Sequence, residues 1–213
     1  MDITNTHCNI TWQDKQGFTL IEIAMVLVII GILVGLGADL FPVLVKQNKL
    51  KENRSIVEET RVAIIGYALA TGRLPYASNT ADGTEDTGIT SGYLPYITVG
   101  GREKDVYLKT LYYAVDSYLC NTTGPTDLKN HLQDLITGTH TPDLYYSGGI
   151  AAAFIVLSPG ENLVADSPND DNGNGRVDMG DNNQFATPDA PVTLSYDDIL
   201  GAASDTYLYG RLP

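Results

Sequence analysis

Residues 18–45 read FTLIEIAMVLVIIGILVGLGADLFPVLV and decide how the rest of the chain is organised. Only two side chains in this stretch ionise, Glu22 and Asp39, and no charge lies between Ala24 and Ala38. About 20 mostly apolar residues in a helix cross the roughly 30 Å hydrocarbon core of a bilayer. A helix that is apolar on every side is buried in protein or in lipid, and this one is too long for the core of so small a chain. We therefore interpret it as a membrane-spanning helix.

A short polar segment precedes this run and ends in Asp14-Lys15-Gln16-Gly17. A secretory signal has an apolar region of about 7–15 residues and a small-residue cleavage site, so the longer run does not match one. The order KQG followed by FTLIE, residues 15–22, instead resembles the prepilin signature of type IV pilins and type II secretion pseudopilins. The basic residue often directly precedes the glycine in that family, whereas here Gln16 intervenes.

The resemblance implies a processing site and an assembly residue. A prepilin peptidase would cut after Gly17 on the cytoplasmic side of the membrane, remove residues 1–17 as a leader, and methylate the new amine of Phe18. Glu22 would pair with the Phe18 amine of a neighbouring copy during filament assembly. The alternative is that Glu22 lies among the lipid headgroups. An acidic side chain at the bilayer centre costs about 2.5–3.5 kcal/mol and is usually functional, which favours the assembly role.

The charge balance excludes one large class of function. The formal net charge is −13, and removal of the leader leaves the chain strongly acidic. Nucleic-acid binding needs a basic face, so we expect no nucleic-acid partner. Cys8 lies in the leader, so Cys120 has no partner for an intrachain disulfide in the mature chain and is expected to be a small buried residue. The sequence contains no nucleophile elbow or phosphate loop, so we do not expect an enzyme.

After Val45 the helical pattern continues but becomes charged. Lys46, Lys49 and Lys51 follow the apolar run directly, and apolar residues then recur with a helical period along one face. Gly72 is a plausible helix stop. We predict one helix over residues 18–72, with 18–45 in the membrane or filament core and the remainder on a globular head. Pro42 lies inside it, where it predicts a mild kink; the resemblance implies instead that Gly31–Pro42 unwinds locally when subunits pack into a filament.

The head comprises residues 73–213. Aromatic and β-branched residues predict strands at Thr110–Leu119 and Ala152–Leu157. Helices are expected at Leu128–Ile136 and from Ser195, where a capping-box pattern occurs. The predicted fold class is α+β, a long N-terminal helix packed on a small antiparallel β-sheet head.

One constellation in the head is typical of a metal site. Residues 170–181 read DDNGNGRVDMGD and follow the spacing of a calcium loop, in which alternate oxygen ligands converge on one hard cation. Position 12 is Asp instead of the usual Glu, and no helical pattern flanks the loop. The alternative is a solvated Asp/Asn/Gly turn. The expected calcium ligands, with Arg176 contributing its backbone carbonyl, are Asp170, Asn172, Asn174, Arg176, Asp178 and Asp181.

Together these patterns favour a structural subunit of a type IV pilus or pilus-like filament. The resemblance implies that its partners are copies of itself, the prepilin peptidase, the inner-membrane assembly machinery and the membrane. It would reside in the inner membrane before assembly and in an extracellular filament or periplasmic pseudopilus afterwards. The alternative is a minor pilin or secretion pseudopilin whose calcium-stabilised head binds a surface or ligand.

Overall fold

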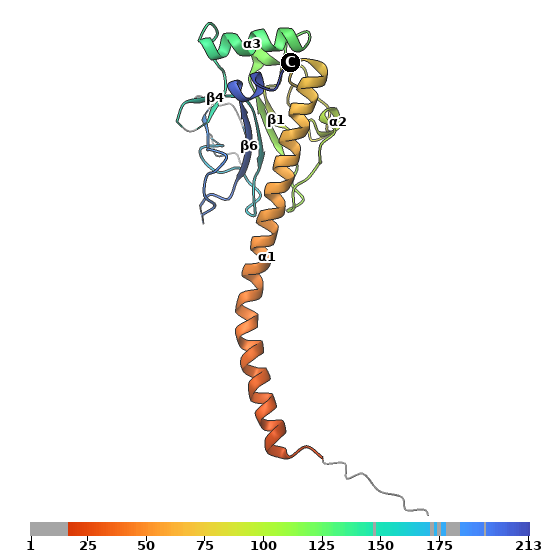
Figure 1. Ribbon diagram of the computed structural model, residues 1–213, viewed down its shortest axis with the longest axis vertical. Helices are drawn as coiled ribbons and strands as arrows, with labels where there is room; N and C mark the ends of the chain where they lie inside the picture. The colour runs from red at the N-terminus through yellow and green to blue at the C-terminus, as the bar shows by residue number, and fades with distance from the viewer. Residues whose placement is uncertain (1–16, 147, 171–172, 174–175, 178–183, 194) are drawn as a thin grey trace, which may run out of the picture. The chain divides into compact units, whose positions relative to one another are not determined.

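The computed structural model describes residues 17–146, 148–170, 173, 176–177, 184–193 and 195–213, apart from the side chains of Leu36 and Asp39. The longest element is helix α1, Leu20–Thr71, which is orange to yellow in Figure 1. It ends where predicted, because Gly72 adopts the left-handed backbone conformation (φ 74°) and donates its N–H to the Ala68 carbonyl oxygen. Pro42 lies inside the helix.

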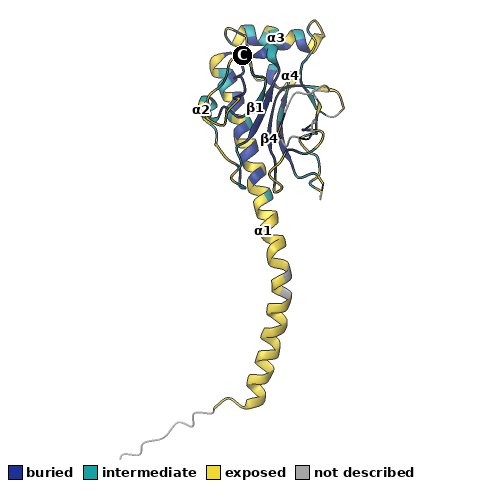
Figure 2. Ribbon diagram, turned by 180° about the vertical axis from the view of Figure 1, so that it is seen from behind, coloured by how far each residue is buried: buried dark blue, intermediate teal, exposed yellow. Residues whose placement is uncertain are grey.

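The chain divides into two compact units, one up to Gln47 and one from Asn48 to Pro213. The described helical residues of the first unit are exposed, as the yellow segment in Figure 2 shows. Leu20, Val28 and Leu44 have 88%, 63% and 57% of their surface exposed. Leaving so much apolar surface in water is unfavourable, so this segment requires lipid or protein around it.

The second unit is built on a six-stranded sheet with β4, Ile150–Ser158, at its centre. Strand β4 pairs antiparallel with β2 (Tyr112–Val115), β3 (Tyr145–Tyr146) and β6 (Ile199–Ser204). The outer strands are β1 (Ser91–Tyr93), antiparallel to β2, and β5 (Gln184–Phe185), parallel to β3. The predicted α+β class and the largely antiparallel sheet are confirmed.

Helix α1 covers one face of this sheet. Its second half contributes Ile56, Val57, Ile64 and Ala68 to a core that also contains Tyr113 and Phe154 of the sheet. Gly201 of β6 lies so close to α1 that a Cβ atom there would meet Val57 Cγ1 at 2.8 Å. The close approach of β6 to α1 therefore requires glycine, which has no side chain, at position 201.

The connection between β4 and β6 covers the opposite face of the sheet. Its residues Ala165, Val177 and Phe185 form a second core with the side chains that alternate to that face, among them Tyr112, Ile155 and Leu157. Figures 1 and 2 both show this connection on the side of the sheet away from α1. Because both faces are covered, β4 is buried from Ala152 onward, which explains its continuous apolar sequence.

The described residues of the head also form three short helices and one 3₁₀ turn: α2 (Tyr96–Val99), η1 (Ser117–Leu119), α3 (Pro125–Thr137) and α4 (Asp205–Tyr209). Helix α3 confirms the helix predicted around Leu128–Ile136. The helix predicted from Ser195 is wrong. Strand β6 begins at Ile199, because pairing with β4 outweighs the local capping-box pattern.

Candidate functional site

The predicted processing site lies just before helix α1. Gly17, Phe18 and Thr19 precede the helix and are exposed. Thr19 is the N-terminal cap: its carbonyl oxygen accepts the Ile23 N–H at 3.2 Å, and its hydroxyl accepts the Glu22 N–H at 3.3 Å. Thr19 and Glu22 therefore have the spacing of a capping box, in which Glu or Gln occupies the third helical position. Glu22 can therefore act as a capping residue of its own helix, which is an alternative to pairing with Phe18 of a neighbouring copy.

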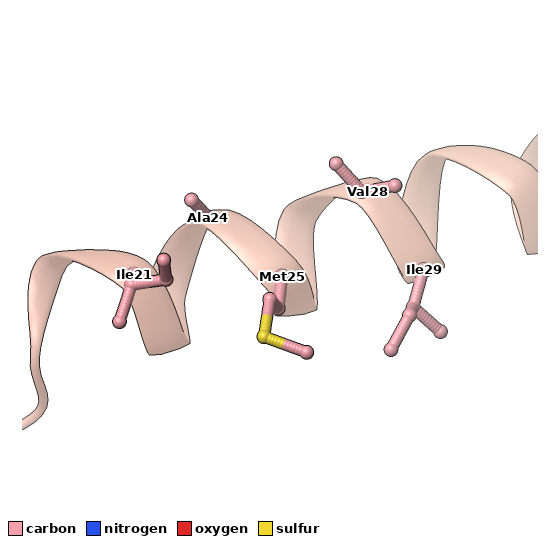
Figure 3. A pocket seen from close by; sticks show the side chains of 5 residues that line it. All are labelled: Ile21, Ala24, Met25, Val28 and Ile29. Atoms are coloured by element: carbon pink, nitrogen blue, oxygen red, sulfur yellow. The ribbon is translucent and has the colours of Figure 1, made fainter.

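The first turns of α1 present an apolar surface. A surface pocket is lined by Ile21, Ala24, Met25, Val28 and Ile29, and Figure 3 shows that these side chains all extend from successive turns at the start of α1. None of the residues in the most apolar window of this helix is buried within the protein. By length and composition α1 is a candidate membrane span. The chemistry available here is apolar contact, with Glu22 as the acidic group.

A second candidate site lies at the base of the β4–β6 connection. Carboxylate oxygens of Asp166, Asp197 and Asp198 lie within 4.8 Å of one another. The sheet brings them together, because Ser158 at the end of β4 pairs with Ile199 at the start of β6. Both ends of the connection therefore meet at this point.

Backbone hydrogen bonds lock the triad in place. Asp166 donates its N–H to Asp198 Oδ2 at 2.8 Å, and Asp197 donates its N–H to Asp166 Oδ2 at 2.8 Å. The Asn169 side chain donates to Asp198 Oδ2 at 2.7 Å. The backbone N–H groups of Glu161 and Asn162 both donate to Asp197 Oδ2. These hydrogen bonds to Asp197 and Asp198 all use the Oδ2 atom of each carboxylate and leave the two Oδ1 atoms out.

Those two oxygens, Asp197 Oδ1 and Asp198 Oδ1, are buried without a hydrogen-bond partner. Asp198 is only 2% exposed, and within the described part of the chain no Lys or Arg forms an ion pair with the triad. Burial is the main cause that raises the pKa of Asp198 to about 7, and the charges of Asp166 and Asp197 raise it further. Burial also raises the pKa of Asp197. Unpaired buried carboxylates are costly, and a hard divalent cation that prefers oxygen ligands would satisfy them.

The calcium loop predicted from the sequence adjoins this triad but is only partly described. Asp170 is buried, accepts the Gly173 N–H at Oδ1, and donates its own N–H to the Asp166 carbonyl oxygen. The Arg176 guanidinium lies 5.6 Å from the centre of the Tyr93 ring. Four of the expected ligands, Asn172, Asn174, Asp178 and Asp181, lie outside the described residues.

Sequence reasoning missed the triad because its members are far apart in the chain. The available signal was Asp197-Asp198 directly before an apolar strand, together with a single Asp early in the same connection. Neither pattern indicates a site until the pairing of β4 with β6 is known.

Comparison with known proteins gave one family match. Residues 12–38 match the family model described as the prokaryotic N-terminal methylation motif. This match covers the predicted processing site and the first turns of α1. The comparison with curated proteins gave no significant match, and neither did the comparison with solved structures.

Proposed function

Because residues 12–38 carry the N-terminal methylation signature of type IV pilins and pseudopilins, we propose that the chain is a structural subunit of a type IV pilus or pilus-like filament. The observation that carries the proposal is this motif at the start of a helix whose first half is apolar and, in its described residues, exposed. The signature is that of a structural protein. A prepilin peptidase cuts after Gly17 and methylates Phe18, and the inner-membrane machinery moves the subunit from the membrane into the filament.

Processing places a positive amine beside the start of a helix. The N-terminus of a helix carries a partial positive charge, so the Phe18 amine is unfavourable there without an anion. Glu22 lies one turn into the helix and can supply that anion to its own amine or to that of a neighbouring copy. We propose that the pair forms between copies, since it neutralises two charges in the apolar filament core and fixes the axial register.

Two variants of Glu22 separate this role from helix capping. Gln also satisfies a capping box but carries no charge. If Glu22 acts through its charge, both Glu22→Gln and Glu22→Ala leave the protein in the membrane but abolish filaments, as seen by electron microscopy of sheared cells. Normal filaments from Glu22→Gln would refute the charge pairing.

We further propose that the head binds a divalent cation, calcium, at Asp166, Asp197 and Asp198. The convergence of the three carboxylates and the two unpartnered buried oxygens support this site. A cation there joins the two ends of the β4–β6 connection and so fixes the cover over the second face of the sheet. The loop at residues 170–181 is a further proposed calcium site, with the ligands named above, and Asp170 connects the two through its bond to Asp166.

Titration calorimetry with calcium on the intact protein tests both sites. Asp198→Asn should remove the triad's binding event, and Asp181→Asn that of the 170–181 loop. Two independent events in the unmodified protein support separate sites. No heat and no thermal shift with calcium would reject both.

A second function is favoured by the acidic head. A minor pilin or secretion pseudopilin with a calcium-stabilised binding head would have the same processing site and helix. Mass spectrometry of purified filaments distinguishes the two, because a major subunit forms most of the filament mass and a minor one is rare.

A further inference from the structure

The basic residues of this acidic chain are concentrated in two segments that the fold brings together. Residues 46–54 and 102–109 contain seven of the 13 Lys and Arg residues but only three of the 26 Asp and Glu residues. The remainder of the chain is therefore even more acidic than the net charge suggests. Within the described residues Arg102 pairs with Glu59, and Lys104 with Glu103 at 3.1 Å. The excess of positive charge in the two segments still creates a local potential that attracts anionic partners.

The segment at residues 102–109, which we call the basic tip, lies beside the head half of α1 and advances toward the helix N-terminus. Arg102 lies next to Glu59, with 3.4 Å between Nε and Oε2. Further along the tip, Tyr107 lies against Lys49, whose Nζ is 5.5 Å from the ring centre. From Glu59 to Lys49 is about 15 Å of helix. Within the head, the tip therefore runs along α1 from Glu59 toward Lys49.

The basic tip is rigidly built. Asp105 Oδ1 accepts the N–H groups of Tyr107 and Lys109 at 2.8 and 2.9 Å. Its other oxygen accepts the Ser158 hydroxyl, which in turn accepts from the Asn53 side chain of α1. The tip is therefore held in one conformation by buried groups, so binding there requires little ordering.

The apex of the tip displays an apolar side chain. Leu108 is 78% exposed and adopts a left-handed backbone conformation (φ 66°) that is uncommon for residues other than glycine. Lys104 is exposed and Lys109 is half-buried on either side of it. An exposed Leu between basic residues suits the boundary of a membrane, where the apolar group enters and the cations remain among the headgroups.

We propose that the basic tip docks on the anionic phospholipid headgroups of the membrane that α1 spans. This rests on the proposed function, because it needs residues 18–45 in the bilayer. Lys49 is only four residues beyond Val45 in α1, about 6 Å of helical rise, and so lies within a Debye length of the headgroups. The contact holds the head against the membrane until the subunit is extracted.

The test places a fluorescent probe at the apex of the full-length chain in lipid vesicles. The probe is Leu108→Trp in a Trp12→Phe background, and brominated acyl chains quench it when it reaches the bilayer. We expect strong quenching in vesicles that contain phosphatidylglycerol. Quenching should be weak in phosphatidylcholine alone, and weak in either lipid at high salt, because salt screens the attraction.

Charge variants of the probe protein identify the residues responsible. Each basic side chain contributes roughly a fivefold preference for an anionic surface, so Lys104→Gln with Lys109→Gln should lower the ratio of docked to free heads about 25-fold. The matched control is Lys129→Gln with Arg211→Gln, because these residues belong to the α3 and C-terminal end of the head (Figure 1). The control should dock normally.

Three results overturn the proposal: equal quenching in both lipids, no effect of the Lys104 and Lys109 variants, or quenching that depends on protein density instead of phosphatidylglycerol. The last would identify a second copy as the partner. Flotation of the vesicles separates this from failure of the proposed function. A chain that does not float with the lipid refutes the membrane span, whereas one that floats without quenching refutes only the docking.

Discussion

Replacing Asp198 with Asn should have opposite effects on stability in the absence and presence of calcium. In the metal-free protein Asp198 is 2% exposed, and burial raises its pKa to about 7, compared with about 3.9 in an unfolded chain. An acid with a raised folded-state pKa makes the folded state lose stability as the pH rises between these two values. At about 1.4 kcal/mol for each pH unit between them, the loss is up to about 4 kcal/mol above pH 7.

Asn can retain the existing hydrogen bonds of this position. Its carbonyl oxygen can accept from the Asp166 N–H and the Asn169 side chain, as Asp198 Oδ2 does. The metal-free Asp198→Asn protein at pH 8 should therefore be more stable than the unmodified protein, by up to about 4 kcal/mol. At calcium concentrations 100 times the dissociation constant, the unmodified protein should gain about 2.7 kcal/mol. For a chain of this size that gain is a rise in Tm of roughly 5–11 °C.

The assay is thermal unfolding followed by circular dichroism at pH 5 and pH 8, with calcium or with a chelator. The Asp198→Asn variant should unfold at a higher temperature than the unmodified protein in chelator at pH 8. Calcium should raise its unfolding temperature less than that of the unmodified protein, because only the proposed site at residues 170–181 remains. The reasoning is refuted if calcium stabilises this variant as much as the unmodified protein. It is also refuted if the metal-free variant is less stable than the unmodified protein at pH 8.

Asp205 provides the matched control. Its two side-chain oxygens are also buried without hydrogen-bond partners, and burial is again the main cause that raises its pKa to about 7. It is not part of the triad. Asp205→Asn should therefore stabilise the metal-free protein at pH 8 in the same way but leave the calcium-induced shift unchanged.

Two further predictions concern the packing of α1 on the sheet. Gly201→Ala should destabilise the head by about 1–3 kcal/mol, because the new Cβ would overlap Val57. Gly66→Ala should instead stabilise it by about 0.5–1 kcal/mol, because the space around Gly66 in α1 is open. Urea unfolding measures both changes, and equal effects of the two substitutions would contradict the packing. Ser158→Ala should lower the free energy of unfolding by about 1–3 kcal/mol in the same assay, because the buried side-chain amide of Asn53 loses its hydrogen-bond acceptor. An unchanged urea midpoint would show that water replaces the hydroxyl.

The sequence alone determined the N-terminal third of the protein. An apolar run of this length forms a helix because every backbone group is satisfied within the segment, and Gly72 ends it because glycine adopts the left-handed conformation without strain. The methylation motif is a local pattern, so its match could be anticipated from residues 15–22. The α+β class and the two principal strands also followed from local periodicity.

Only the tertiary structure decided the convergence of the three carboxylates and the position of the basic tip. Asp166 is separated from Asp197 and Asp198 by most of the β4–β6 connection, and the register of Ser158 with Ile199 brings their carboxylates together. In the same way, Lys49 and Tyr107 meet because the sheet packs on α1. Strand pairing and helix packing act between residues far apart in the chain, and local spacing carries no information about them. For the same reason the capping pattern at Ser195 was overruled by β6.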